Sequence, residues 1–165
     1  MKCLVTGGAG FIGSHLVDLL LVQNHEVAVL DNYSTGRKEN LNHVADRIKL
    51  VECDLATPGE WVNEFQDIDW VFHLASLADI VPSIQNPESY HRANVDGTFY
   101  VLQACRHANI KRFVYAASSS CYGIPDTYPT PETAEIRPHY PYALAKRMGE
   151  DSETAGSHQS KDHSC

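Results

Sequence analysis

A glycine-rich turn between an apolar run and an amphipathic segment is the feature that most constrains the fold. The stretch TGGAGFIG occupies residues 6–13 and follows the apolar run Lys2–Thr6. After it, apolar side chains recur at three- and four-residue steps, which is typical of a helix packed on one face. Three glycines of the turn follow the pattern Gly-x-Gly-x-x-Gly, which permits a tight turn and close approach of a pyrophosphate to the backbone. This strand, turn and helix context predicts a dinucleotide-binding site.

Two further features of the same unit support that prediction. The helix that begins near Phe11 presents unpaired N–H groups and the positive end of its dipole to a phosphate. Asp31 ends the next apolar run, eighteen residues beyond Gly13. A carboxylate in this place accepts hydrogen bonds from ribose hydroxyls and repels a 2′-phosphate. We therefore expect the site to prefer NAD over NADP.

Apolar runs and helical patterns alternate along the chain. Five apolar runs predict strands at Lys2–Thr6, Glu26–Asp31, Ile48–Glu52, Asp69–His73 and Arg112–Ala117. Amphipathic periodicity predicts helices from Phe11 to about Leu20, over Gly59–Phe65, from Tyr90 to about Ala108, and from about Tyr142 onward. Strands this apolar need both faces covered, so helices must lie on both sides of the sheet. The pattern predicts an α/β fold with a doubly wound parallel sheet.

Composition limits the classes of partner. The 165 residues include 13 Lys+Arg and 21 Asp+Glu, which gives a formal net charge of −8. An acidic chain disfavours nucleic acid or an anionic membrane as the main partner, because both require a basic surface. No apolar run is long enough for a membrane span or a signal-peptide core. Five scattered cysteines without a Cys-x-x-Cys pair indicate reduced thiols, so we expect a cytoplasmic protein.

The end of the chain breaks this pattern. From residue 151 the sequence runs DSETAGSHQSKDHSC, with Ala155 and Cys165 as its only apolar side chains. So polar a segment buries too little surface to offset its ordering entropy. We expect one domain over residues 1–150 and a disordered polar tail over residues 151–165. The histidines and the cysteine of this tail are weak support for a metal site, and we predict no metal.

Seven motifs occur in the order found in one enzyme family. They are TGGAGFIG, a strand ending in Asp31-Asn32, Cys53-Asp54-Leu55, His73-Leu74-Ala75, Asn94-Val95-Asp96-Gly97-Thr98, Ser118-Ser119-Ser120-Cys121-Tyr122-Gly123 and Tyr142-x-x-x-Lys146. With these motifs the sequence resembles the extended short-chain dehydrogenases/reductases, and among them the NAD-dependent nucleotide-sugar epimerase/dehydratase group. The resemblance covers residues 1 to about 150. It implies a Rossmann domain, NAD as the cofactor and a nucleotide-sugar substrate in which the sugar is linked to UDP.

The resemblance also implies roles for individual residues. Tyr142 is implied as the catalytic base, Lys146 as the group that favours its ionised form and holds the nicotinamide ribose, and Ser118 as the third member of the triad. The residues implied to bind the cofactor are Gly7, Gly10, Phe11, Ile12, Gly13, Asp31, Asn32, Asp54, Leu55, Ala75, Asn94, Tyr142 and Lys146. Asp54 matches the family's adenine-binding acid. Asn94 matches its buried amide, which holds the catalytic helix and the tyrosine loop.

The residues themselves leave other interpretations open. Tyr142 and Lys146 stand four apart on a helix and share a face, where an ammonium favours the phenolate. The alternative is a packed tyrosine beside a solvated lysine. Asp54 is alternatively a loop acid that caps a turn, and Asn94 an amide on a helix face. His73 lies within an apolar run and is interpreted as a packed core histidine rather than a catalytic group.

Three serines after the fifth strand narrow the reaction. In the family that the sequence resembles, 4,6-dehydratases carry Thr-Asp-Glu at the positions of Ser118, Ser119 and Ser120. They need these groups because eliminating water requires an acid and a base beside the sugar. Decarboxylases of UDP-glucuronate carry a glutamate in place of Ser120. The serines therefore favour a UDP-sugar 4-epimerase with a transient 4-keto intermediate. Ala78 stands where UDP-galactose 4-epimerases usually have a lysine, which favours N-acetylhexosamine or uronic acid substrates.

Family members continue beyond the Tyr-x-x-x-Lys helix with further strands and a substrate lobe. The resemblance therefore implies that this chain is a truncated N-terminal portion whose C-terminal substrate lobe is missing. Two hypotheses stay open: a UDP-sugar 4-epimerase in truncated form, and a non-catalytic NAD-binding or dimerising fragment. Apolar faces on the Tyr90–Ala108 and Tyr142–Glu150 helices pair across a dimer in relatives, so we expect a homodimer.

Overall fold

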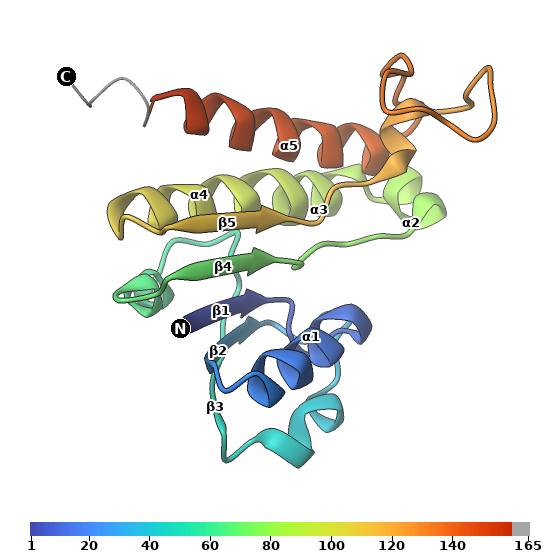
Figure 1. The fold of residues 1–165 in the computed structure, drawn as a ribbon. Coiled ribbons are helices and arrows are strands. Elements are labelled where there is room, and N and C mark those ends of the chain that lie inside the picture. Colours follow the sequence, from blue (N-terminus) through green and yellow to red (C-terminus); the bar gives the residue numbers. More distant parts are fainter. Residues whose placement is uncertain (160–165) are drawn as a thin grey trace.

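A parallel five-stranded sheet forms the centre of the molecule (Figure 1). The computed structural model describes residues 1–159. The strands are β1 (Lys2–Thr6), β2 (Glu26–Asp31), β3 (Ile48–Glu52), β4 (Trp70–His73) and β5 (Arg112–Tyr115), in the order β3-β2-β1-β4-β5. Every pairing is parallel, and Thr6 lies in register beside both Leu30 and His73. All five predicted strands are present, and the predicted fold class is confirmed.

Helices connect the strands and cover both faces of the sheet. The α-helices are α1 (Phe11–Val22), α2 (Ile80–Gln85), α3 (Pro87–His91), α4 (Gly97–His107) and α5 (Pro141–Gln159). Turns of 3-10 helix are η1 (Lys38–Val44), η2 (Glu60–Phe65) and η4 (Ser119–Tyr122), and a π-helical segment, η3 (Arg92–Asp96), joins α3 to α4. In Figure 1, α5 lies alongside α4, and α1 lies near β1 and β2.

Alternate positions of the strands build two apolar cores. On the α1 side the buried core residues are Cys3, Val5, Ala9, Val17, Leu20, Leu21, Val27, Val29, Leu41 and Val44. On the α4 side they are Leu4, Ala28, Leu30, Leu55, Trp61, Phe65, Val71, Val101, Ala104 and Cys105. Successive residues of a strand point to opposite faces, as a strand covered on both sides requires. By this alternation Thr6 and His73 face α4.

The connections change direction between β1 and β4, and this change places a crevice at their carboxyl ends. The chain passes from β1 to β2 and β3 on one side, then crosses back to β4 and β5 on the other. Doubly wound sheets bind ligands at such a switch point, outside the carboxyl ends of the strands. The glycine-rich turn after β1 and the loop after β4 therefore meet where a ligand is expected.

The helices differ in part from those predicted. The helix predicted from Tyr90 begins at Pro87 and is interrupted by η3, whose π-helical hydrogen bonds span five residues instead of four. The helix predicted over Gly59–Phe65 is a 3-10 helix that begins at Glu60. Helix α2 and turn η1 were not predicted from the sequence.

Helix α5 is longer than the sequence analysis predicted. It runs to Gln159, so the disordered tail predicted from residue 151 is wrong for residues 151–159. Arg147 and Asp151 form an ion pair at 2.5 Å across one turn of this helix. Each residue added to an existing helix gains one hydrogen bond, so a polar segment can continue a helix that tertiary packing has nucleated. The rest of the predicted tail, residues 160–165, lies outside the described residues.

The cysteines that the structure describes are free thiols. Cys3, Cys105 and Cys121 are buried, and Cys53 is partly buried. Burial raises the pKa of Cys53 to about 11 and that of Cys105 to about 12, so these two thiols stay protonated at neutral pH. Within residues 1–159, no helix has both the length and the apolar character needed to cross a membrane.

Alanine at Gly13 should destabilise the fold, although alanine normally favours a helix. A Cβ there would overlap the Gly7 carbonyl oxygen and lie 2.7 Å from the Gly8 Cα. Because backbone cannot move aside cheaply, we expect urea denaturation to show a loss of about 1–3 kcal/mol in the free energy of unfolding.

Gly97→Ala is the matched control for this change. A Cβ at Gly97 would meet no atom closer than 3.7 Å, so alanine at that position should leave stability unchanged or raise it by up to about 1 kcal/mol. If Gly13→Ala were as stable as the parent chain, the close packing of α1 on the glycine-rich turn would be contradicted.

Candidate functional site

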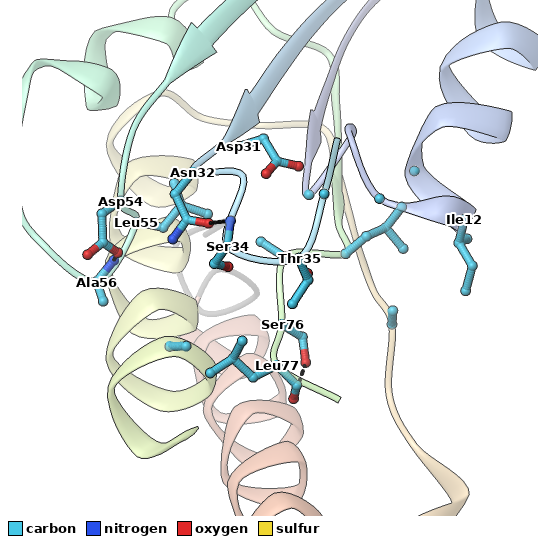
Figure 2. Close-up of a pocket in the computed structure, with 18 of the residues that line it drawn as sticks. Ile12, Asp31, Asn32, Ser34, Thr35, Asp54, Leu55, Ala56, Ser76 and Leu77 are labelled. Atoms are coloured by element: carbon cyan, nitrogen blue, oxygen red, sulfur yellow. Dashed lines mark hydrogen bonds between the residues drawn. The ribbon is translucent and has the colours of Figure 1, made fainter. Parts of the chain in front are cut away.

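A cavity of about 340 Å³ lies at the carboxyl edge of the sheet (Figure 2). Ten of the residues predicted to bind the cofactor line it: Gly7, Gly10, Phe11, Ile12, Gly13, Asp31, Asn32, Asp54, Leu55 and Ala75. Figure 2 shows Asn32 and Asp54 at one end of the cavity and Ile12 at the other. The structure brings these side chains together, and their contacts with a cofactor stay predictions.

Other residues of the cavity were not among those predicted to bind the cofactor. They are Ser34, Thr35, Gly36, Cys53, Ala56, Leu74, Ser76, Leu77, Ala93 and Ala116. All except Ala93 lie in the segments that directly follow β2, β3, β4 or β5. The carboxyl ends of parallel strands meet at one edge of a sheet, so position after a strand was the signal that could have found them.

The glycine-rich turn offers open space and free donors to an anion. Gly10 is the N-cap of α1, whose first turn has neither a side-chain cap nor an acidic residue. A Cβ on Gly10 would meet only the Gly7 carbonyl oxygen, at 3.2 Å, so the space beside Gly10 is otherwise open. Gly7 has a φ of 70°, and a Cβ there would lie 2.6 Å from the Ala75 nitrogen. An uncapped helix N-terminus beside a bare glycine fits the pyrophosphate of a dinucleotide.

Asp31 holds the glycine-rich turn as well as lining the cavity. One of its carboxylate oxygens accepts a hydrogen bond from the Ala9 N–H at 2.9 Å, and the other accepts from the Tyr33 N–H at 2.8 Å. Each carboxylate oxygen has a second lone pair, which can accept from a hydroxyl group in the cavity. Sequence reasoning predicted the ribose contact but missed the bond to Ala9, which lies 22 residues away along the chain.

Asp54 caps a turn and also lines the cavity. Its Oδ1 accepts from the Ala56 N–H at 3.0 Å, which confirms the turn-capping alternative. Its Oδ2 accepts from the Arg92 guanidinium at 2.6 Å, and Arg92 also donates to the Thr57 hydroxyl at 2.7 Å. These bonds fix the carboxylate beside Leu55 at one end of the cavity. The contact of Asp54 with an adenine stays a prediction.

Residues 74–77, which follow β4, form one wall of the cavity, and we call this segment the wall loop. Asn94 holds it from behind: its side-chain nitrogen donates to the Leu77 carbonyl at 2.9 Å, and its side-chain oxygen accepts from the Leu77 N–H at 2.8 Å. The resemblance implied that Asn94 binds the cofactor and holds the catalytic helix with its tyrosine loop. In the structure Asn94 is 1% exposed, and both polar atoms of its side chain bind Leu77 of the wall loop. Its segment η3 also packs against α5. A contact of Asn94 with the cofactor stays a prediction.

Tyr142 and Lys146 lie one turn apart on α5, and Lys146 is buried. The lysine is 4% exposed, and its ammonium lies 4.2 Å from the centre of the Tyr115 ring. Tyr142 is half-buried, with its ring edge-on to that of Tyr90 at a centroid distance of 6.4 Å. Burial lowers the pKa of Lys146 to about 8, so most of the lysine is charged at neutral pH. The alternative of a solvated lysine is therefore wrong.

A close contact between β5 and α5 sets the depth of Lys146. The Tyr115 hydroxyl donates to the Lys146 carbonyl at 3.3 Å. A Cβ at Gly149 would overlap that hydroxyl, so α5 can approach the strand this closely only with glycine at this position. Burial raises the pKa of Tyr115, which keeps its ring neutral beneath the lysine.

Ser118 lies at the start of η4, away from the lining of the cavity. Its hydroxyl accepts from the Ser120 N–H at 3.2 Å and caps this turn. Ala116, two residues earlier, does line the cavity. Among the residues that the structure describes, the lining set does not include Ser118, Tyr142 or Lys146, so these three are not gathered into the same hollow as the glycine-rich turn. Their catalytic roles stay predictions.

Lys146→Met should change how stability depends on pH. Burial lowers the pKa of Lys146 from 10.5 to about 8, so the unfolded chain binds more protons than the folded chain between these values. Through this lysine, stability must rise with pH from about 8 to 10.5, and the destabilisation is fully present below pH 8. We expect urea denaturation to favour the methionine variant most at pH 7, with the advantage shrinking toward pH 10.5.

Lys2→Met, at an exposed lysine of β1, is the control for this series. Its stability relative to the parent chain should not follow the pH profile of Lys146→Met. A difference between Lys146→Met and the parent that stays constant from about pH 7 to 10.5 would show that Lys146 is not buried as described.

Known proteins are similar to this chain in sequence and in fold over most of its length. The sequence profile of the NAD dependent epimerase/dehydratase family matches residues 3–162. A putative UDP-glucose 4-epimerase of Methanocaldococcus jannaschii is 40% identical over 151 residues, which cover 90% of this chain and 48% of the relative. The solved UDP-Glc/GlcNAc 4-epimerase of Campylobacter jejuni matches with a TM-score of 0.91 and 31% identity, over 96% of this chain and 49% of that one.

Other matches show the range of activities among similar proteins. The UDP-glucose 4-epimerase of Thermus thermophilus, solved as a complex with NAD, matches with a TM-score of 0.89 and 35% identity, over 96% of this chain and 51% of that one. A dTDP-glucose 4,6-dehydratase and a UDP-glucuronic acid decarboxylase are also similar to the chain. In each comparison the chain spans about half the length of its relative or less.

Proposed function

The chain belongs to the NAD dependent epimerase/dehydratase family, and we propose that it forms the cofactor-binding part of a UDP-sugar 4-epimerase. The observation that carries this proposal is the burial of Lys146 one helical turn after Tyr142, on a helix that packs against η3 behind the wall loop. Burying an ammonium is costly, so a lysine held in this way is expected where its charge has a use.

NAD is the cofactor of this family, and the residues around the cavity fit it. The N-terminus of α1 and the bare Gly10 would hold the pyrophosphate, and Asp31 would hold the adenosine ribose and exclude a 2′-phosphate. When bound, NAD would supply the hydride acceptor and donor for C4 of the sugar.

In this proposal the proton is moved by residues of η4 and α5. The Tyr142 phenolate takes the proton of the sugar 4-hydroxyl and later gives it back, as a general base and then a general acid. The charge of Lys146 favours the phenolate over the phenol. Ser118 orients the sugar hydroxyl toward Tyr142. For the triad to act together, the Ser118 hydroxyl must exchange its bond with the Ser120 N–H for one with substrate.

The serines of η4 support epimerisation over the other reactions of the family. A 4,6-dehydratase needs an acid and a base beside the sugar to eliminate water, and Ser118, Ser119 and Ser120 offer neither. Ser120 likewise stands in place of the glutamate that the decarboxylases carry. Ala78, just beyond the wall loop, removes the lysine usual in UDP-galactose 4-epimerases, so we propose a UDP-N-acetylhexosamine or UDP-uronic acid as substrate.

We also propose that the chain forms a homodimer through α4 and α5 and acts in the cytoplasm. Phe99, Leu144 and Met148 are large apolar side chains on these helices that are 37% to 50% exposed. Leu144 and Met148 also line a second hollow, of about 540 Å³, between α5 and the neighbourhood of Pro87. Exposed apolar surface of this kind favours association.

A non-catalytic NAD-binding or dimerising role is the alternative function, and a measurement of turnover separates the two.

The chain should bind NAD more tightly than NADP, and Gly10→Val should abolish binding. A valine side chain would occupy the open space beside the Gly7 carbonyl, where the pyrophosphate is expected to run. We expect calorimetric titration of the variant to show no heat of NAD binding, with an unchanged circular dichroism spectrum as the control for folding. NADP binding that equals or exceeds NAD binding in the parent chain would contradict the role proposed for Asp31.

Tyr142→Phe should remove turnover and leave NAD bound. The test uses this chain joined to the C-terminal half of the Methanocaldococcus jannaschii relative, with interconversion of UDP-N-acetylglucosamine and its 4-epimer as the measurement. Loss of the general base is expected to slow turnover by about 10²–10⁴-fold. Tyr140→Phe, two residues earlier, is the matched control and should keep the parent rate. A joined chain that binds NAD but shows no turnover with any UDP-sugar would favour the non-catalytic alternative.

A further inference from the structure

The wall loop is held at both ends by residues from different elements. At its start, the Leu74 N–H donates to the Thr6 carbonyl at 3.1 Å, and the Ala75 N–H donates to the Thr6 hydroxyl at 3.3 Å. At its end, Leu77 is held through both backbone groups by the Asn94 side chain. Thr6 ends β1 and Asn94 lies in η3, so the two attachments have no backbone in common.

His73 connects these two attachments through its two ring nitrogens. Its Nδ1 lies 2.7 Å from the Thr6 hydroxyl, and its Nε2 lies 3.0 Å from the Thr98 hydroxyl. The Thr98 hydroxyl in turn donates to the Asn94 carbonyl at 2.7 Å. His73 is 1% exposed, and its ring stacks on that of Tyr115, so the predicted core position of His73 is confirmed.

The directions of these hydrogen bonds follow from the last acceptor, the Asn94 carbonyl. A carbonyl only accepts, so the single proton of the Thr98 hydroxyl is used on Asn94. The Thr98 oxygen must then accept from Nε2–H of His73, which leaves Nδ1 with a lone pair in a neutral ring. That lone pair accepts the Thr6 hydroxyl proton, and the Thr6 oxygen is free to accept from the Ala75 N–H. These four hydrogen bonds then run in one direction, with each group donating to the next from the Ala75 N–H to the Asn94 carbonyl.

We propose that His73 is a positioning residue of the cofactor site: as a neutral imidazole protonated on Nε2, it completes a hydrogen-bond chain from the Ala75 amide to the Asn94 carbonyl and so fixes both ends of the wall loop relative to each other. The proposal depends on the cofactor cavity and not on the 4-epimerase reaction. His73 touches neither cofactor nor substrate in this role.

The surroundings of His73 keep the ring neutral. Burial, and after it the charge of Lys146, together lower the pKa of His73 to about 3. Tyr115, stacked on the same ring, has its pKa raised by burial and carries no charge. An imidazolium would have no lone pair for the Thr6 hydroxyl, so protonation would break the chain at its centre.

The tautomer is tested first, on the unaltered 165-residue chain. Nitrogen-15 NMR of the histidine rings at neutral pH should show His73 with a protonated Nε2 and an unprotonated Nδ1. A Nδ1–H tautomer, or a doubly protonated ring, would overturn the proposal. This measurement requires no variant and no bound cofactor.

The connection through His73 is tested with Thr98→Val, which keeps the side-chain shape and removes the hydroxyl. The proposal expects the amide resonance of Ala75, which shares no hydrogen bond with Thr98, to shift along with that of Leu77. NAD affinity, measured by calorimetry, should fall about three- to tenfold, as expected for loss of one buried hydrogen bond. Thr98→Ser, which keeps the hydroxyl, should restore both the amide shifts and the affinity.

A second background separates this connection from general loosening of the core. His73→Asn keeps an oxygen that can accept from Thr6 but has no nitrogen at the ε position, so adding Thr98→Val to it should no longer shift the Ala75 amide. The proposal would be overturned if Thr98→Val did not shift the Ala75 amide resonance in the parent chain. It would also be overturned if the shift were the same in the parent chain and in His73→Asn. Absence of NAD binding by the parent chain would instead contradict the cofactor assignment, while the amide shifts would still decide the role of His73.

Discussion

Backbone packed directly on backbone at the glycine-rich turn sets the position of everything around the cavity. Gly13 of α1 lies so close to Gly7 that no Cβ fits between them, and Gly7 is also too close to Ala75 of the wall loop for a Cβ. Strand β1, helix α1 and the wall loop are therefore held at distances that side chains would not allow. Because of this contact α1 begins at the edge of the sheet, with its uncapped N–H groups at the cavity.

Asp31 couples the shape of that turn to the choice of ligand. The carboxylate that is expected to select NAD is also the acceptor for the Ala9 amide in the middle of the turn. A neutral or positive side chain at this position would remove the repulsion of a 2′-phosphate and loosen the turn at the same time. Cofactor preference at this site is thus tied to the conformation of the backbone that binds the pyrophosphate.

Local patterns predicted the framework, and contacts between distant residues could not be predicted. The strands and the glycine-rich turn follow from periodicity and composition, and ten predicted cofactor residues lie around one cavity because they follow strand ends. The bonds of His73 join residues 67 and 25 positions away in sequence, so no local pattern shows them. The π-helical turn at Asn94 was hidden by the helical period, and the length of α5 depended on packing at its start.

Because Tyr115 and Gly149 are in close contact, the residue sizes that these two positions allow depend on each other. The Tyr115 phenol fills the space that a side chain at residue 149 would need. The distance between β5 and α5 therefore depends on a large residue at position 115 and none at position 149. In a lineage of such proteins, a larger residue at position 149 would be tolerated together with a smaller one at position 115. Such a paired exchange would also remove the aromatic ring that lies against the Lys146 ammonium. Covariation of residues 115 and 149 would therefore indicate a changed environment of Lys146, even where the lysine itself is kept.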